Sequence, residues 1–240
     1  MEPWQWALSI SFVALAGFVR GLSGFGSAMI LMPGLSLLFG PQQVVATVIL
    51  LEMTASVRLV PEAIPQTKWS EVLPMAIAAV IMVPLGAFCL SLIDPDLMRQ
   101  IIGGLLLVFV ALLLSGISYQ GQPTMAINFG VGGLSGFLTG LTGIGGPPIV
   151  LYQMTGDDTA AESRANFISF FALTQVVALA SYMASGLLSP LVLQRFLIFL
   201  PVSLVGLVLG QFLFKYVSET AFRKVVMGLL VAIALLALWP

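Results

Sequence analysis

Two glycine-rich stretches decide the fold: GLSGFGSAM from Gly21 to Met29, and GLTGIGGPP from Gly140 to Pro148. They lie 119 positions apart. At that offset, residues 17–31 match residues 136–150 at seven of fifteen positions. Because both stretches interrupt hydrophobic sequence at matching places, we predict that the chain consists of two copies of one unit.

The composition indicates that both copies lie in a membrane. Hydrophobic residues make up 59% of the chain, charged residues only 8%, and the mean hydropathy is +1.09. So few polar side chains cannot cover a folded chain in water. Each half contains about five apolar segments, most near the length that spans hydrocarbon as a helix. We predict an all-α integral membrane domain with transmembrane repeats at residues 1–120 and 121–240, inverted because five is odd.

The basic residues predict how this domain is oriented. In the predicted topology one side collects most of them: Arg58, Lys68, Arg164, Lys215, Arg223 and Lys224. The other side holds only Arg99, with Arg195 a short way into a helix. Because the side richer in lysine and arginine is usually cytoplasmic, both termini are expected to lie outside.

Each glycine-rich run is expected to break a helix within the membrane, as a broken helix or a re-entrant hairpin. Unpaired backbone groups cost several kcal/mol each in lipid, so such breaks are tolerated only beside protein or a water-filled cavity. A half-helix that begins after each break would point its positive dipole end into that cavity, which predicts an anion site without a metal. The backbone positions expected at this site are Gly21, Gly24, Gly26, Gly140, Gly143, Gly145, Gly146 and Pro147. The alternative for the glycines is close helix packing through small residues.

Polar residues near the two runs complete the predicted anion site. Ser23 and Thr142 are equivalent in the repeat and offer hydroxyl donors, or else they satisfy the backbone. Arg20 is the only full positive charge beside either run, and its alternative role is to anchor two helices. Arg164 and Asn166 follow the second run. They either contact the anion from the cytoplasmic side, or Arg164 anchors a helix end.

Glu52 lies inside the apolar run VVATVILLEMTASVRLV. An ionised side chain there costs about 2.5 to 3.5 kcal/mol, so it should face a cavity or be protonated. The chain has no histidine, so Glu52 is the candidate for a proton-coupling group, and pairing with Arg20 or Arg164 is the alternative. A lone cysteine, Cys89, excludes a disulfide and a cysteine metal cluster. We therefore expect no cofactor and no metal.

The two runs resemble the signature of a known family. Each half opens with G-x-x-x-G-x-x-G-x-G, and the second continues as GGPPIV and is followed by ESRANF. This pattern resembles the TauE/SafE, or sulfite exporter, family over essentially the whole chain. The resemblance implies a bacterial-type inner-membrane permease, without a cofactor, for sulfite, sulfoacetate, other sulfonates or other small anions. Ser27 and Ala28 depart from the signature, since the second half has Gly146 and Pro147 at those positions.

The function expected from these observations is secondary transport of a small sulfur-containing anion by alternating access, with the anion between the two breaks. An anion channel and a noncatalytic scaffold subunit are the alternatives. GLSG occurs twice, as around the serine of rhomboid proteases, but without a histidine base we expect no enzyme. The partners expected are the anion, the lipid bilayer and, as a further option, a second copy of the chain. A net charge of −1 without a basic block argues against nucleic acid.

Overall fold

The computed structural model describes residues 2–114, 124–153, 158–218, 221 and 228. These residues form helices and connections, with no strand among them. The helices are α1 (Pro3–Ser23), α2 (Ser27–Ser36), α3 (Pro41–Ala63), the 3-10 turn η1 (Ile64–Gln66), α4 (Trp69–Leu92), α5 (Pro95–Leu114), α6 (Met125–Thr142), α7 (Gly146–Gln153), α8 (Ala160–Ala184) and α9 (Pro190–Phe214). The predicted border between residues 120 and 121 lies outside the described residues, as do Arg223 and Lys224.

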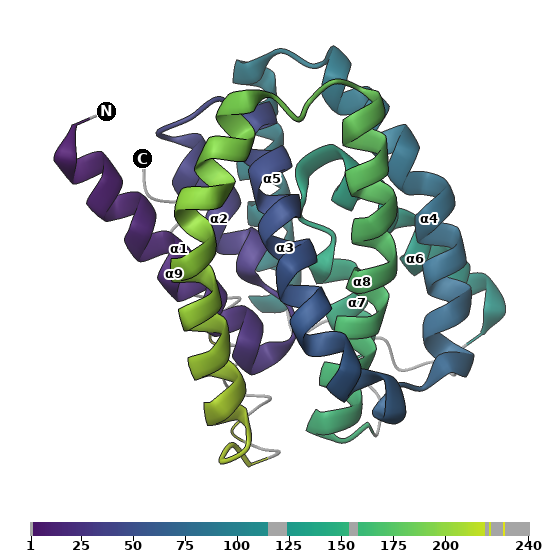
Figure 1. Ribbon diagram of the computed structural model, residues 1–240. Helices are drawn as coiled ribbons and strands as arrows, with labels where there is room; N and C mark the ends of the chain where they lie inside the picture. The colour runs from purple at the N-terminus through teal and green to yellow at the C-terminus, as the bar shows by residue number, and fades with distance from the viewer. Residues whose placement is uncertain (1, 115–123, 154–157, 219–220, 222–227, 229–240) are drawn as a thin grey trace.

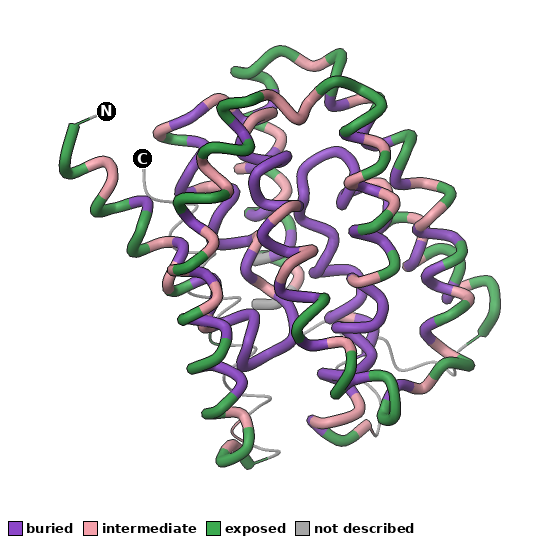
Figure 2. Tube along the Cα trace, in the orientation of Figure 1, coloured by how far each residue is buried: buried purple, intermediate pink, exposed green. Residues whose placement is uncertain are grey.

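Among the described residues, six helices are long and apolar enough to cross a membrane: α1, α3 with η1, α4, α6, α8 and α9. The outward faces of α4 and α9 are strongly apolar, with Ile81, Phe88, Leu197 and Phe212 exposed. Figure 2 shows exposed positions concentrated on the outer helices, while the helices between them are largely buried. A surface of this kind suits lipid rather than water. The prediction of an all-α, multi-pass membrane protein is confirmed.

The helices pair across the two halves of the sequence. Helix α1 packs along α9, α6 packs along α4, and α3 packs against α8. In Figure 1, α3 and α8 lie near the middle of the molecule and run in opposite directions, since α3 connects to α4 at the bottom and α8 connects to α9 at the top. Each half therefore contributes the packing partners of the other.

Glycine allows α1 to pack closely against α9, and α6 to pack closely against α4. A Cβ at Gly21 would lie 2.0 Å from the carbonyl oxygen of Leu207 on α9, and one at Gly140 would lie 2.1 Å from that of Val83 on α4. Real Cβ atoms do not approach backbone this closely, so the crossings require glycine at these positions. Gly17 and Gly136, one turn earlier on each helix, meet backbone in the same way.

Both glycine-rich runs coincide with the ends of helices. Helix α1 ends at Gly24, whose φ of +81° is left-handed, and α6 ends at Gly143, whose φ is +73°. Glycine adopts this conformation without the steric cost that other residues meet. The next helices start at Ser27 and Gly146, again 119 residues apart (146 − 27 = 119). Pro147 lies in the first turn of α7, where proline's missing N–H is not needed.

Candidate functional site

A small cavity lies where the two helix breaks meet the central helices α3 and α8. Its volume is about 20 Å³, which is room for about one water molecule. Six predicted site residues line it: Arg20, Gly26, Glu52, Gly143, Gly145 and Gly146. Both half-helix starts therefore face the same space, together with one acidic and one basic side chain.

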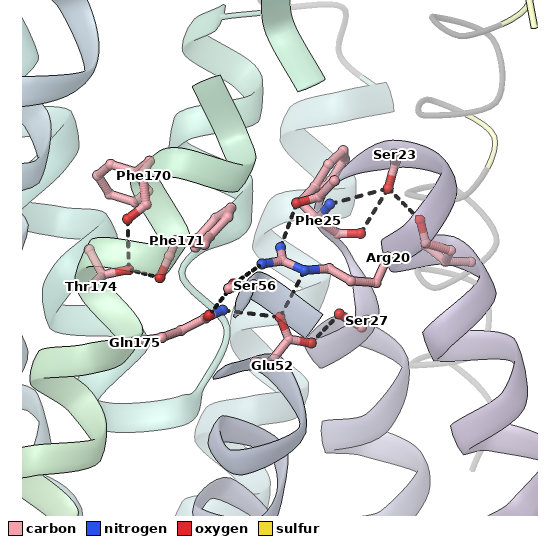
Figure 3. Close-up of polar contacts among 12 residues, drawn as sticks. Arg20, Ser23, Phe25, Ser27, Glu52, Ser56, Phe170, Phe171, Thr174 and Gln175 are labelled. Atoms are coloured by element: carbon pink, nitrogen blue, oxygen red, sulfur yellow. Dashed lines mark hydrogen bonds and ion pairs between the residues drawn. The ribbon is translucent and has the colours of Figure 1, made fainter. Parts of the chain in front are cut away.

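Arg20 and Glu52 form a buried ion pair at this cavity (Figure 3). Arg20 is 1% exposed and Glu52 is 5% exposed, and Arg20 Nε lies 3.4 Å from Glu52 Oε2. Of the two arginines considered as partners of Glu52, Arg20 and Arg164, the structure pairs it with Arg20. The two charges neutralise each other, which is how a buried charge is usually tolerated.

The guanidinium of Arg20 is held in place by several neighbours (Figure 3). Nη1 donates to the carbonyl of Gly24 at 2.5 Å, at the negative end of the α1 dipole, and Nη2 donates to Ser56 Oγ at 2.9 Å. Its charge also lies 5.4 Å from the centroid of the Phe171 ring. Nε is close to Glu52 but is not aligned for a hydrogen bond, so this N–H has no acceptor among the described residues.

Glu52 receives hydrogen bonds from both halves of the chain. Ser27 Oγ, at the start of α2, donates to Oε1, and Gln175 Nε2, on α8, donates to Oε2 at 3.1 Å. Ser56 Oγ in turn donates to Gln175 Oε1 at 2.6 Å. Ser56 and Gln175 are 119 positions apart, the same spacing as the two glycine-rich runs, and their hydrogen bond joins α3 to α8 at the site (175 − 56 = 119).

The hydroxyl groups of Ser23 and Thr142 form hydrogen bonds with backbone groups at the two helix breaks. Ser23 Oγ donates to the carbonyls of Val19 and Phe25, each at 2.8 Å. Thr142 Oγ1 donates to the carbonyl of Leu138 at 2.8 Å and accepts from the N–H of Ile144 at 3.1 Å. Each hydroxyl therefore satisfies backbone groups that the break would leave unpaired, and neither lines the cavity.

The second glycine run is held tightly against α6. A Cβ at Gly145 would lie 1.9 Å from Thr139 Oγ1, and Ser135 Oγ donates to the Gly145 carbonyl at 2.5 Å. Gly146 has space around it, since its nearest neighbour would be 3.5 Å from a Cβ. Gly145 is thus required for close approach, and Gly146 leaves room beside the start of α7.

The remaining predicted residues lie away from the cavity. Gly21 and Gly140 lie at the helix crossings, and Pro147 lies inside the first turn of α7. A Cβ at Gly24 would lie 3.0 Å from Arg164 Cγ. Arg164 itself donates from Nη2 and Nε to the carbonyls of Gly21 at 2.7 Å and Leu22 at 3.2 Å. It therefore holds the C-terminal turn of α1.

Asn166 joins two connections at one end of the molecule. Its Oδ1 accepts from the N–H of Lys68 at 2.8 Å, and its Nδ2 donates to Asp158 Oδ2 at 3.3 Å. Lys68 Nζ donates to Asp158 Oδ1 at 2.5 Å, and this hydrogen bond raises the pKa of Lys68 above its usual value. Asn166 thus links the α3–α4 and α7–α8 connections and does not reach the central cavity.

Seven residues that line the cavity were not among the predicted site residues: the apolar Ala28, Met29, Ile49 and Ile144, together with Thr139, Phe171 and Gln175. Gln175 could have been identified from the sequence, because a side-chain amide inside an apolar run needs a hydrogen-bonding partner in the membrane. Thr139 lies 119 positions after Arg20, and Phe171 lies 119 positions after Glu52 (139 − 20 = 119; 171 − 52 = 119). The charged pair at the cavity comes from the first half of the chain, and the residues at this spacing in the second half are uncharged.

Comparison with known proteins agrees with the membrane fold. Residues 9–237 match the family described as "Sulfite exporter TauE/SafE". The chain is 25% identical over 234 residues to a protein of Cupriavidus necator named "Probable sulfite/organosulfonate exporter TauE", covering 93% of this chain and 90% of that protein. No solved structure gives a significant match. The chain belongs to the sulfite exporter TauE/SafE family, which confirms the expectation of a membrane transport protein rather than an enzyme.

Proposed function

We propose that this protein is a secondary transporter for a small sulfur-containing oxyanion, such as sulfite, sulfoacetate or another sulfonate. The observation that carries the proposal is the buried Arg20, whose Nε donor lacks an aligned acceptor beside a cavity that both helix breaks line. The name of the Cupriavidus relative, a sulfite or organosulfonate exporter, supports the substrate class. Arg20 supplies the charge for the anion, and the glycine backbone allows it to approach closely.

The two halves act as inverted repeats that expose the central cavity alternately to each side. The supporting observations are the 119-residue spacing of the helix breaks (142 − 23 = 119) and the antiparallel pair of α3 and α8. The crosswise pairing of α1 with α9 and α6 with α4 is also expected of two related halves. The protein lies in a bacterial-type inner membrane with both termini outside. A homodimer stays a prediction, which crosslinking in membranes tests.

The size of the cavity supports alternating access. A volume of about 20 Å³ holds about one water molecule, so a sulfur oxyanion with three oxygens needs the walls to move apart. An open channel would instead require a continuous polar path. Movement of one set of helices against the other provides the space for an anion while keeping the bilayer sealed.

Glu52 controls when Arg20 is free to bind. While Glu52 is ionised it neutralises Arg20, so an anion must displace it or bind after Glu52 takes up a proton. Ser27 and Gln175 hold the carboxyl in place in either state, since both can donate to it. Transport of one anion is therefore coupled to protonation of Glu52, which pairs with Arg20 at the cavity.

Calorimetric titration of the detergent-purified protein with sulfite tests this role of Arg20. Replacing Arg20 alone would leave Glu52 buried without its partner, at a cost of about 3 to 5 kcal/mol. The informative variant is therefore the double change Arg20→Gln with Glu52→Gln, which removes both charges together. It should lose sulfite binding at the central cavity, whereas Glu52→Gln alone should bind sulfite more tightly than the native protein at neutral pH.

The control for this titration is Arg99→Gln, because Arg99 pairs with exposed Asp96 and does not line the central cavity. It should bind sulfite like the native protein. An unchanged number of sulfite ions bound per chain, with unchanged affinity, in a folded double variant would refute the role of Arg20.

A further inference from the structure

A second, larger cavity lies beside the C-terminal turn of α1. Its volume is about 190 Å³, against about 20 Å³ for the central cavity. Its walls come from the end of α3, the start of α8 and the end of α9. The polar side chains that line it are Glu62, Gln66, Arg164, Gln211 and Lys215.

The charges around this second cavity favour an anion. Arg164 and Lys215 contribute two positive charges and Glu62 one negative charge, which leaves the lining at +1 (2 − 1). Glu62 also lies 4.0 Å from Arg58 Nη1, so its charge is shared with a cation outside the cavity. No ion pair joins Arg164 or Lys215 to an acid within the described part of the chain.

Two buried groups in this cavity have unused hydrogen-bonding capacity. Arg164 is 6% exposed and uses Nε and Nη2 on the carbonyls of α1, while Nη1 makes no hydrogen bond to any described residue. Gln211 is also 6% exposed, and its Oε1 has no partner among the described residues. An unpaired amide oxygen as deeply buried as Gln211 Oε1 is costly, which points to a ligand with polar atoms, and Arg164 Nη1 is a free donor for the same ligand.

We infer that this second cavity binds a singly charged oxyanion between the Arg164 guanidinium and the Lys215 ammonium. The Gln211 amide is the neutral partner for a protonated or neutral oxygen of the same anion. The identity of the anion as the transported sulfur compound rests on the proposed function. The cavity then serves as an entrance site that holds the anion before it reaches Arg20.

Arg164 also links this entrance site to the central cavity. Its two bonded N–H groups hold the carbonyls of Gly21 and Leu22, in the same helical turn that carries Arg20. A charged oxyanion is a stronger acceptor than a peptide carbonyl. An anion that binds Arg164 therefore competes for these donors and loosens the end of α1, which carries Arg20 of the central cavity.

The test uses a background in which the central cavity is already neutral, namely Arg20→Gln with Glu52→Gln. Sulfite is titrated calorimetrically into this variant in nanodiscs of phosphatidylcholine. We expect one sulfite per chain to bind, and its Kd to rise roughly tenfold or more when Lys215→Gln is added. Arg164→Lys, which keeps the charge but loses the planar fork, should also weaken binding. Arg99→Gln added to the same background should leave the Kd unchanged, and circular dichroism verifies that each variant is folded.

Two results would overturn the entrance site. One is a folded background variant that binds no sulfite, or binds it with a Kd that Lys215→Gln does not change. The other is complete loss of this binding when phosphatidylglycerol is included in the nanodisc, because the cavity would then be a site for a lipid phosphate. If sulfite binding depends on Lys215 but the native protein does not transport sulfite, the proposed function is refuted and the entrance site is retained.

Discussion

Substitution of Gly140 by alanine tests the close packing between α4 and α6. Sequence reasoning placed Gly140 at the anion, whereas in the structure it lies at a helix crossing. A Cβ there would lie 2.1 Å from the carbonyl oxygen of Val83 and 2.8 Å from the N–H nitrogen of Ala87. Both are backbone atoms, so the helices themselves must move to make room.

The structure gives the size of that movement. Ordinary contact of a Cβ begins at 3.4 Å, so α6 must shift from α4 by about 1.3 Å at Gly140 (3.4 − 2.1). Overpacking of this kind costs typically about 1 to 3 kcal/mol, against a gain of up to about 1 kcal/mol from the better helix propensity of alanine. We expect Gly140→Ala to be destabilised by roughly 1 to 2 kcal/mol. Gly133, seven residues earlier on α6, would place its Cβ 3.6 Å from Met82 Cγ, so Gly133→Ala should be neutral or slightly stabilised.

Thermal unfolding of the two variants in detergent, followed by tryptophan fluorescence, makes the comparison. Gly140→Ala should unfold at a lower temperature than the native protein, and Gly133→Ala should not. Below its unfolding temperature Gly140→Ala should bind sulfite with the native Kd, because the residue packs against α4 and does not line the central cavity. Equal stability of the two variants would refute the close crossing of α4 and α6. Loss of sulfite binding in a folded Gly140→Ala would indicate that Gly140 belongs to the anion site.

Other substitutions test separate parts of the account. Gly143→Ala should cost about 1 to 2 kcal/mol through its positive φ alone, since its nearest neighbour would lie 3.7 Å from the new Cβ; an unchanged unfolding temperature would contradict this. Tyr182→Phe should lose about 1 kcal/mol in the same assay, because the buried hydroxyl donates to the carbonyl of Gly140 at 2.8 Å. The stability that Lys68 contributes through Asp158 should be fully present below the ordinary lysine pKa of about 10.4 and be lost as the pH rises through the higher pKa of the folded protein. Lys68→Met should therefore differ from the native protein at neutral pH and converge with it at strongly alkaline pH.

The all-helical membrane fold could be predicted because it depends on composition and on segment length. The positions of the helix ends were also accessible, since glycine at a left-handed C-cap and proline in a first turn are local features. The pairing of α1 with α9 and of α4 with α6 could not be predicted. Glycines spaced four apart indicate a close crossing, but they do not identify the partner helix.

The charged centre of the site was only partly predictable, for a similar reason. Glu52 stands out as an acid inside an apolar run, and Arg20 as a cation beside a glycine run, but each had more than one available partner. Their pairing depends on how α1 and α3 are placed by tertiary contacts. Gln175 on α8 and Ser56 on α3 complete the network, and the packing of α3 against α8 brings them together.

The glycine runs combine two roles that the sequence does not separate. Gly21 and Gly140 precede the breaks and pack against neighbouring helices. Gly143 and Gly145 follow the end of α6 and line the cavity. All lie in the same motif, and spacing alone does not distinguish close packing from a site for a ligand, because both need the absence of a Cβ.

Sulfite flux in proteoliposomes tests the central claim most directly. Native protein, the Arg20→Gln with Glu52→Gln variant and Arg99→Gln are reconstituted at equal density, and sulfite movement is followed at several pH values. If Arg20 binds the transported anion, we expect sulfite flux in the native protein and in Arg99→Gln, and no flux above that of empty liposomes in the double variant. We also expect that Glu52→Gln alone loses the pH dependence of the native flux. Undiminished flux in a folded double variant would contradict the account, since the anion would then cross without the charge of Arg20.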